Sequence, residues 1–462
     1  MRPSAVLRRR LRLSALVLLV FPVLVSGALH AADGDLDPDF QAGQVTVGWT
    51  DPATAVAIEP LANGAMLIGG TITDPPRWAI AKLNKLGAYD LGWGLGFTPF
   101  GFGNDGASAA GNLFDMETDP GTGNTLVAGW VEISAGIERP ALARLLPGGV
   151  LDPSFDSNGL LVVGPIPAGW TSLQVNDAKI LPDGRAVFVG SCKSCPTAGQ
   201  KSVFVTRRLA SGAADTTFSG DGWLSFTASD DYGSYANAVA VADNGNIVIA
   251  GQIPLDLDAL AFIARLLPSG ALDASFGDGS GIGEFPFVAS DTRPVDIALD
   301  PSSARIAVGL ANFFMLGGVL VLDGAGLADT TFSDDGFREL DLEEGVDIAA
   351  VAFQSDGKLL AVGTINANGA QEGGFFLARF HTTGALDASF DGNGVKRVEF
   401  DAAPNVADGA LAVTTIAGKL VAAGFAGAGT GDDQEFAIVR TASSHLFSDG
   451  FEHGSVAGWA GY

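Results

Sequence analysis

Three stretches of the sequence bring acidic and aromatic side chains together, a combination that binds sugars and cationic peptides. They are "PIPAGWTSLQVND" at 165–177, "ASDDYGSYAN" at 228–237 and "LEEGVD" at 342–347. The candidate ligand-binding residues in them are Trp170, Asp230, Asp231, Tyr232, Tyr235, Glu343 and Glu344. Paired carboxylates also perform acid–base hydrolysis, so an extracellular polymer hydrolase or lyase is the alternative to binding. Plain solvated connections are a third interpretation.

The two cysteines, Cys192 and Cys195, stand in "GSCKSCP". In an exported protein this spacing predicts a local disulfide that pins a loop. A redox pair and half a zinc site are the alternatives, but zinc requires two further ligands and the sequence has no second cysteine pair.

The sequence contains no recognised catalytic signature. It has no GxSxG elbow, HExxH helix, Walker loop or Rossmann fingerprint. We therefore predict no catalytic residue, no metal ligand and no cofactor, with a binding scaffold as the function and an unknown glycan or protein as the partner.

A recurring motif organises the chain. An aspartate recurs at Asp37, Asp90, Asp152, Asp215, Asp273, Asp329 and Asp387, at intervals between 53 and 63 residues. An aromatic follows three residues later each time, at Phe40, Trp93, Phe155, Phe218, Phe276, Phe332 and Phe390. A period of this length indicates a single repeat array.

Each repeat contains four runs of strand length. In the unit that ends at Phe390 they are "GFRELDL", "VDIAAVAFQSDG", "KLLAVGTI" and "GGFFLARF". Asp356-Gly357 joins the second run to the third in a tight hairpin. Four antiparallel strands per unit predict an all-β fold, a β-propeller with four-stranded blades. Kelch and WD repeats and a parallel β-helix have shorter periods.

The two ends of the array are complementary. The first strand-like run, "QVTVGW" at 44–49, follows the first motif, whereas the last unit lacks a fourth strand. We expect seven blades at 33–442, closed by the N-terminal strand, which removes exposed sheet edges. The remaining residues, 443–462, form a tail of the type "DGFExG".

The motif is predicted to be structural. Its aspartate can fix an Asx turn, which directs the aromatic into the seam between blades. A basic residue lies eleven positions before most of the aromatics, and its expected partner is the motif aspartate. Arg208 is assigned this role in the third blade with a slip of one residue, whereas the fifth blade carries Val321 instead. Calcium bound by the Gly-Asp-Asn turns is the alternative, although no turn matches an EF-hand loop.

Two segments carry a family resemblance. "ARFHTTGALDASFDGNGV" at 378–395 and "ARLLPSGALDASFGDGSG" at 264–281 resemble the delta-60 repeat. That resemblance extends over residues 34 to 442 and implies a β-propeller in a secreted bacterial protein. It implies no activity and no functional residues.

The first 32 residues have the layout of a secretory signal peptide, with a basic start, a short apolar run and small residues at its end. An uncleaved membrane anchor is the alternative. Removing these residues leaves 21 basic against 52 acidic residues, a net charge of −31. We therefore expect a secreted or periplasmic monomer that has no membrane span and does not bind nucleic acid.

Overall fold

Short runs rich in Val, Ile, Leu and Ala form antiparallel strands throughout the repeat array. The computed structural model describes residues 33–48, 51–74, 76–102, 111–134, 136–195, 201–229, 231–255, 259–286, 292–312, 316–342, 345–366, 373–400, 408–427 and 434–442. The predicted signal peptide at 1–32 and the tail at 443–462 lie outside these ranges.

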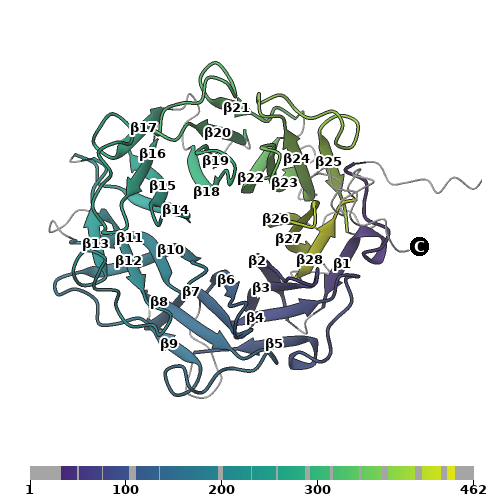
Figure 1. Cartoon of the computed structure of the whole chain (residues 1–462), viewed down its shortest axis with the longest axis horizontal. Coiled ribbons are helices and arrows are strands. Elements are labelled where there is room, and N and C mark those ends of the chain that lie inside the picture. The colour runs from purple at the N-terminus through teal and green to yellow at the C-terminus, as the bar shows by residue number, and fades with distance from the viewer. Residues whose placement is uncertain are drawn as a thin grey trace, which may run out of the picture. The chain divides into compact units, whose positions relative to one another are not determined.

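The strands form seven antiparallel sheets of four strands each. The sheets are arranged around a common centre, and the first strand of each sheet contacts the first strands of both neighbouring sheets (Figure 1). This arrangement confirms the predicted seven-bladed β-propeller. We number the blades 1 (β2–β5), 2 (β6–β9), 3 (β10–β13), 4 (β14–β17), 5 (β18–β21), 6 (β22–β25) and 7 (β26–β28 with β1).

Within blades 1 to 6 the strands run from the centre outwards in chain order, and in blade 7 β26, β27 and β28 are followed by β1. The innermost strands are β2 (Ala53–Pro60), β6 (Leu113–Thr118), β10 (Thr171–Ile180), β14 (Tyr235–Val241), β18 (Arg293–Leu299), β22 (Val346–Phe353) and β26 (Gly409–Ile416). The second strands are β3 (Met66–Thr73), β7 (Thr125–Ser134), β11 (Ala186–Lys193), β15 (Ile247–Pro254), β19 (Ile306–Ala311), β23 (Leu359–Asn366) and β27 (Lys419–Gly427).

The third strands are β4 (Pro76–Leu83), β8 (Ile137–Leu145), β12 (Lys201–Arg208), β16 (Ala259–Leu266), β20 (Gly318–Leu322), β24 (Gly373–Phe380) and β28 (Gln434–Arg440). The outermost strands are β5 (Phe97–Phe100), β9 (Leu160–Val162), β13 (Trp223–Phe226), β17 (Ile282–Pro286), β21 (Phe337–Glu339), β25 (Val395–Val398) and β1 (Gln44–Val47). Two 3-10 turns, η1 (Gln41–Gly43) and η2 (Gly94–Gly96), precede β1 and β5. Among the described residues, neither of these short 3-10 helices is long enough to cross a membrane.

The middle strands of the blades are buried on both faces. All eight side-chain positions of β24 are buried, as are seven of the eight in β3. Neighbouring blades cover both faces of each sheet. The sequences of these strands are therefore continuous apolar runs rather than alternating apolar and polar residues.

Strand β1 closes the ring. It pairs antiparallel with β28, with Gln44 opposite Val439 and Val47 opposite Phe436. The first and last parts of the array therefore share blade 7, as the sequence predicts, and β28 has no free edge along this stretch.

The motif aromatics fill the seams between blades. All seven are at most 3% exposed. Phe276, for example, packs against Val248 and Ile263 of blade 4 and against Val308 and Leu320 of blade 5. Each ring therefore links two blades, which confirms the direction predicted from the motif.

Six motif aspartates bind a basic side chain on the third strand of their own blade. The pairs are Lys82–Asp90 (3.0 Å), Arg144–Asp152 (2.8 Å), Arg207–Asp215 (2.7 Å), Arg265–Asp273 (2.7 Å), Arg379–Asp387 (2.8 Å) and Arg440–Asp37 (2.7 Å). Each of the five guanidinium groups also lies 4.3 to 4.9 Å from the centre of its motif ring. The Asp, the Arg and the aromatic thus form one stacked unit.

The assignment of Arg208 to the third blade was wrong. Arg207 binds Asp215, so the spacing of eleven residues to Phe218 holds without a slip. Because side chains alternate along a strand, Arg208 points to the other face of blade 3, where its guanidinium lies 4.8 Å from the ring of Trp223.

Blade 5 lacks the motif cation. Among the described residues, no Lys or Arg lies within ion-pair distance of Asp329, whose carboxylate accepts the N–H and Oγ1–H of Thr331. Arg305 instead crosses this seam from the β18–β19 hairpin and donates to the carbonyl oxygens of Gly357 (2.8 Å) and Thr382 (3.5 Å). The link between blades 5 and 6 is therefore made from a different strand.

A glycine at the start of most motifs sits close to the aromatic ring of the preceding blade. Gly326 has φ +80°, and a Cβ built there would lie 2.5 Å from the ring of Phe276. Gly148, one position before the corresponding glycine of blade 2, has no atom within 4 Å of such a Cβ.

We therefore predict opposite outcomes for two Gly→Ala substitutions. Gly326→Ala should lower the free energy of unfolding by about 1–3 kcal/mol, because it strains the backbone and displaces Phe276. Gly148→Ala should leave it unchanged or raise it by a few tenths, since the unfolded chain loses entropy. Urea denaturation of both variants measures the difference, and equal midpoints would contradict the packing described for Gly326.

Candidate functional site

Trp170 lies against the core between blades 2 and 3. It is half-buried, and its ring meets that of Trp223 edge to face at 5.6 Å. This contact gives Trp170 a structural role in the seam and leaves less of its face for stacking on a ligand.

The other candidate loop residues are only partly brought together. Asp231 and Tyr232 are exposed in the β13–β14 connection, whereas Tyr235 is half-buried with Lys201 Nζ 5.5 Å from its ring centre. Asp230, Glu343 and Glu344 lie outside the described residues. The three predicted stretches all connect an outermost strand to the next innermost strand, so they belong to the same side of the ring.

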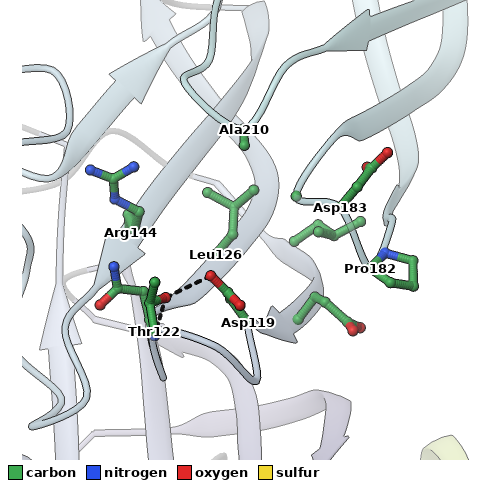
Figure 2. Close-up of a pocket in the computed structure, with 11 residues that line it drawn as sticks. Asp119, Thr122, Leu126, Arg144, Pro182, Asp183 and Ala210 are labelled. Carbon is green, nitrogen blue, oxygen red and sulfur yellow. Dashed lines mark hydrogen bonds between the residues drawn. The ribbon is translucent and has the colours of Figure 1, made fainter.

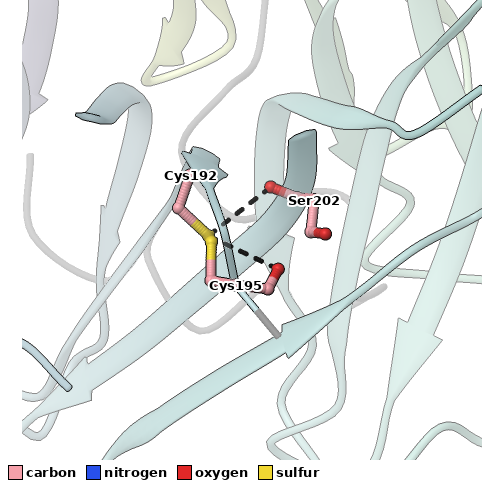
Figure 3. Close-up of a disulfide and its surroundings, with 3 residues drawn as sticks. All are labelled: Cys192, Cys195 and Ser202. Atoms are coloured by element: carbon pink, nitrogen blue, oxygen red, sulfur yellow. Dashed lines mark hydrogen bonds between the residues drawn. A yellow bond between two sulfur atoms is a disulfide. The ribbon is translucent and has the colours of Figure 1, made fainter. Parts of the chain in front are cut away.

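Cys192 and Cys195 form a disulfide at the end of β11 (Figure 3). Both side chains are fully buried and belong to the apolar cluster between blades 2 and 3. The bond thus ties the end of β11 to the seam core. Within the described ranges, no three His, Cys, Asp or Glu side chains are grouped so as to hold a metal ion.

Two kinds of hydrogen bond link consecutive motifs across the seams, and we call them the joint bonds. In the first kind, the motif arginine donates through Nη1 to a carbonyl of the next blade. Examples are Arg207 to Pro268 (2.7 Å), Arg265 to Gly324 (2.5 Å) and Arg440 to Lys85 (2.7 Å). In the second kind, the N–H that follows the aromatic donates to a neighbouring carbonyl. Examples are Gly94 to Gly148, Ser219 to Ser269, Gly277 to Ala325 and Asp391 to Asp33.

The seam between blades 2 and 3 has neither joint bond. Arg144 donates through Nε to Asp152 and through Nη2 to Ser154, and its Nη1 has no acceptor among the described residues. The equivalent carbonyl in blade 3 belongs to Ala210. The N–H of Asp156, which follows the motif aromatic, likewise makes no bond to Ser211 in the described part of the chain. Among the described residues, Arg144 therefore has a donor without an acceptor in this seam, as Arg379 does at its Nη1 in the seam between blades 6 and 7.

A pocket of ≈ 390 Å³ lies where these bonds are missing (Figure 2). Figure 2 shows Arg144 on one side of it and Asp183 on the other, with Leu126 and Asp119 between them and Ala210 above. The complete lining is Glu117, Asp119, Thr122, Asn124, Leu126, Arg144, Ile180, Pro182, Asp183, Gly184 and Ala210. The pocket is thus formed by the first hairpins of blades 2 and 3 and by the motif arginine.

The pocket contains two carboxyl groups with opposite pKa shifts. Burial raises the pKa of Glu117, and the nearby charge of Lys179 only partly offsets this effect. Hydrogen bonds from the Thr122 hydroxyl and the Gly121 N–H lower the pKa of Asp119. One carboxyl group therefore holds a proton more readily than the other.

A set of carboxylates on the innermost strands was missed by the sequence analysis. Asp177 accepts the N–H of Ala178 and that of Val239 in the next blade, each at 2.8 Å. Asp296 does the same with Ile297 and Val351. Both follow a β-bulge, so each satisfies an N–H that the irregular inner strand leaves unpaired. These acids link the blades near the centre.

Lys179 lies beside these groups and pairs with Asp115 at 2.9 Å. Its side chain is 44% exposed, whereas that of Asp115 is 16% exposed. Lys179 is thus a cation among several acids, and the pair connects blade 2 to blade 3 close to Glu117.

Burial raises the pKa of Asp177 to about 8, although two N–H donors oppose the shift. Because the folded protein binds this proton more tightly than the unfolded chain, stability should fall as pH rises from about 4 towards 8, by up to about 1.4 kcal/mol per pH unit for one carboxyl group. Denaturant midpoints measured from pH 4.5 to 8.5 should therefore decrease, and Asp177→Asn should flatten the slope. Identical slopes for the two proteins would contradict this role of Asp177.

The fold is a seven-bladed β-propeller, and polar pockets at equivalent places lie between blades 2 and 3 and between blades 4 and 5, the latter with a volume of ≈ 450 Å³ and Arg265 in its lining. In agreement, residues 122–155 and 354–390 match the family model "Domain of unknown function (DUF5122) beta-propeller". Each match covers the second and third strands of a blade and ends at the motif aromatic. No curated protein has a sequence similar to this chain.

Several solved structures resemble the fold at low identity. The polysaccharide lyase Uly1 is 11% identical over 89% of this chain and 97% of its own, with a TM-score of 0.45. The GH93 alpha-L-arabinofuranosidase of Fusarium graminearum is 9% identical over 75% and 99%, with a TM-score of 0.46. A glucose dehydrogenase is 12% identical over 69% and 95%, with a TM-score of 0.37. These similarities carry no conclusion about function.

Proposed function

We propose that the chain is an exported, non-catalytic binding protein whose ligand site is the pocket between blades 2 and 3. The observation that supports this proposal is the open Nη1 of Arg144 in the seam that lacks both joint bonds. Arg207 and Arg265 use the same atom to bind the next blade. A repeated scaffold carries function where its pattern is interrupted.

The lining favours a ligand rich in hydroxyl groups. Arg144 offers N–H donors, whereas Asp119 and Asp183 offer carboxylate oxygens on the facing hairpins. A hydroxyl group both donates and accepts, so neighbouring sugar hydroxyls can bind both sides at once. Anionic ligands are disfavoured by the net charge of −26 of the whole chain. We therefore propose a neutral glycan.

The wider biological setting is also a proposal. The basic and apolar start of the sequence supports export by a signal peptide at 1–32, and the repeated motif supports assignment of the units to the delta-60 repeat. We propose a monomer in the periplasm or outside the cell, with calcium at the Gly-Asp-Asn turns as a further ligand to be tested.

Calorimetric titration of the mature protein against neutral oligosaccharides, with and without calcium, tests the site. Arg144→Gln should weaken binding by about tenfold or more, because it removes the open donor. Arg265→Gln is the matched control, since it also loses an aspartate partner but lies in a seam with both joint bonds. Equal affinity of Arg144→Gln and the unsubstituted protein would contradict the proposed site.

One observation favours a second candidate, a hydrolase or lyase. Glu117 and Asp119 share a pocket and have pKa values shifted in opposite directions, as a general acid and its partner carboxylate require. Reducing-sugar release from polysaccharides that is lost in Glu117→Gln would support this candidate. No release by the unsubstituted protein would leave the binding function.

A further inference from the structure

The seam between blades 4 and 5 contains a pocket that is larger than the one between blades 2 and 3. It has a volume of ≈ 610 Å³, within the range of sites for small organic molecules. Its lining is Phe285, Pro286, Thr292, Leu310, Asn312, Leu316, Leu320, Asp335, Phe337 and Glu339. It lies between the outermost strand of blade 4 and the outer strands of blade 5.

The pocket forms because the two facing blades differ in strand length. In blade 4, β16 has eight residues and β17 has five, whereas β20 and β21 of blade 5 have five and three. The described outer strands of blade 5 are therefore shorter than the strands β16 and β17 that they face. Phe285 and Phe337, from the two blades, are only partly buried against the seam core as a result.

The floor and one wall of the pocket are apolar. Leu310 and Leu320 are nearly fully buried beneath it, at 1% and 2% exposure. Leu316, at the rim, is 43% exposed. Large aliphatic and aromatic surfaces at a concave site favour an apolar ligand body, worth about 25 cal/mol for each Å² removed from water.

The charged residues of the lining are both acidic. Asp335 and Glu339 are exposed on either side of Phe337, and no Lys or Arg is part of the described lining. The whole chain adds to this potential with its net charge of −26. A ligand with a cationic end is therefore attracted, whereas an anionic one of the same shape is repelled.

We propose that this pocket binds a small amphiphilic amine, with its apolar body between Phe285 and Leu320 and its ammonium group beside Glu339. The site is separate from the pocket between blades 2 and 3, and its occupancy does not depend on that proposal. Its recognition combines apolar burial with charge complementarity.

Three ligands of the same shape test the proposal by calorimetric titration of the mature protein. They are tryptamine, the neutral 3-ethylindole and the anionic indole-3-propionate. Tryptamine should bind with the highest affinity, about tenfold or more above indole-3-propionate, and its advantage should shrink in high salt. Equal affinity for the amine and the acid, or no saturable binding of tryptamine, would overturn the proposal.

Two substitutions locate the site. Leu316→Trp should fill the pocket and weaken tryptamine binding about tenfold, whereas Leu327→Trp, at another exposed leucine outside the lining, should not. Glu339→Gln should bring tryptamine and 3-ethylindole to similar affinities. Unchanged melting temperatures control for folding, and unchanged tryptamine binding in Leu316→Trp would overturn the placement.

Discussion

Deleting residues 33–47 is expected to abolish the cooperative folding of the propeller. The deletion removes β1 and with it the pairing to β28, and it removes Phe40, which is fully buried between blades 7 and 1. Burying one such ring contributes about 1.5–3 kcal/mol, and a domain of this kind is stable by only about 5–15 kcal/mol in total. Circular dichroism during thermal and urea denaturation measures the loss.

The same deletion leaves charged groups without their partner. Asp37 is 1% exposed and accepts hydrogen bonds from Arg440 (2.7 Å) and Lys419 (2.6 Å). A peptide of residues 33–48, added to the truncated protein, should therefore bind along β28 and restore the melting transition. A truncated protein that melts like the full-length protein would contradict closure by β1.

Arg207→Met and Arg208→Met are expected to change stability in opposite directions although the residues are adjacent. Arg207 binds Asp215 at 2.7 Å, and both side chains are at most 4% exposed. Its loss leaves a buried carboxylate whose remaining cation, Arg185, lies 3.9 Å away. The expected cost is about 3–5 kcal/mol.

Arg208 is 3% exposed, and its Nε and Nη2 have no acceptor among the described residues. Burial lowers its pKa to about 10. A methionine keeps the packing on Trp223 and removes an unpaired buried charge, so Arg208→Met should be neutral or stabilising by about 1–4 kcal/mol. The urea denaturation midpoints of the two variants test this difference in stability. Destabilisation of similar size in both variants would show that Arg208 has a partner.

Much of the fold follows from the sequence because the repeat is regular. Seven copies of one motif, together with a recurring hairpin turn, fix the number of blades. The last unit lacks a fourth strand, and this identifies β1 as the strand that completes it. Local spacing does not identify Arg440 as a motif cation, because its aspartate, Asp37, lies 403 residues earlier in the chain. Its sequence context, "AIVR" at 437–440, resembles the strand before the other motifs, so it was recognisable once closure was assumed.

The candidate site was harder to predict. The pocket between blades 2 and 3 is lined by Arg144, whose sequence context matches that of Arg265, and Arg265 lines a pocket at the equivalent place between blades 4 and 5. Composition also does not reveal that Trp170 packs on Trp223, since that contact joins different strands of one blade. The inner carboxylates Asp177 and Asp296 did leave a signal, because both stand at the same position of a first strand.

The structure changes where function should be sought. The predicted loop residues Asp231, Tyr232 and Tyr235 share one connection, whereas the pocket lies among first hairpins and a motif arginine. Both the connection and the pocket lie away from the regular joint bonds between blades. The motif itself is best described as the link between blades, and the copy in which Arg144 makes no joint bond is the place to test for a ligand.

Native-state amide hydrogen exchange tests most directly whether the motifs and β1 tie seven blades into one closed ring. If they do, the amides of residues 44–47 exchange only through global unfolding, with the same free energy as their partners at 436–439. Exchange of residues 44–47 at a much lower free energy than β28 and the strands of blade 3 would contradict the closed ring.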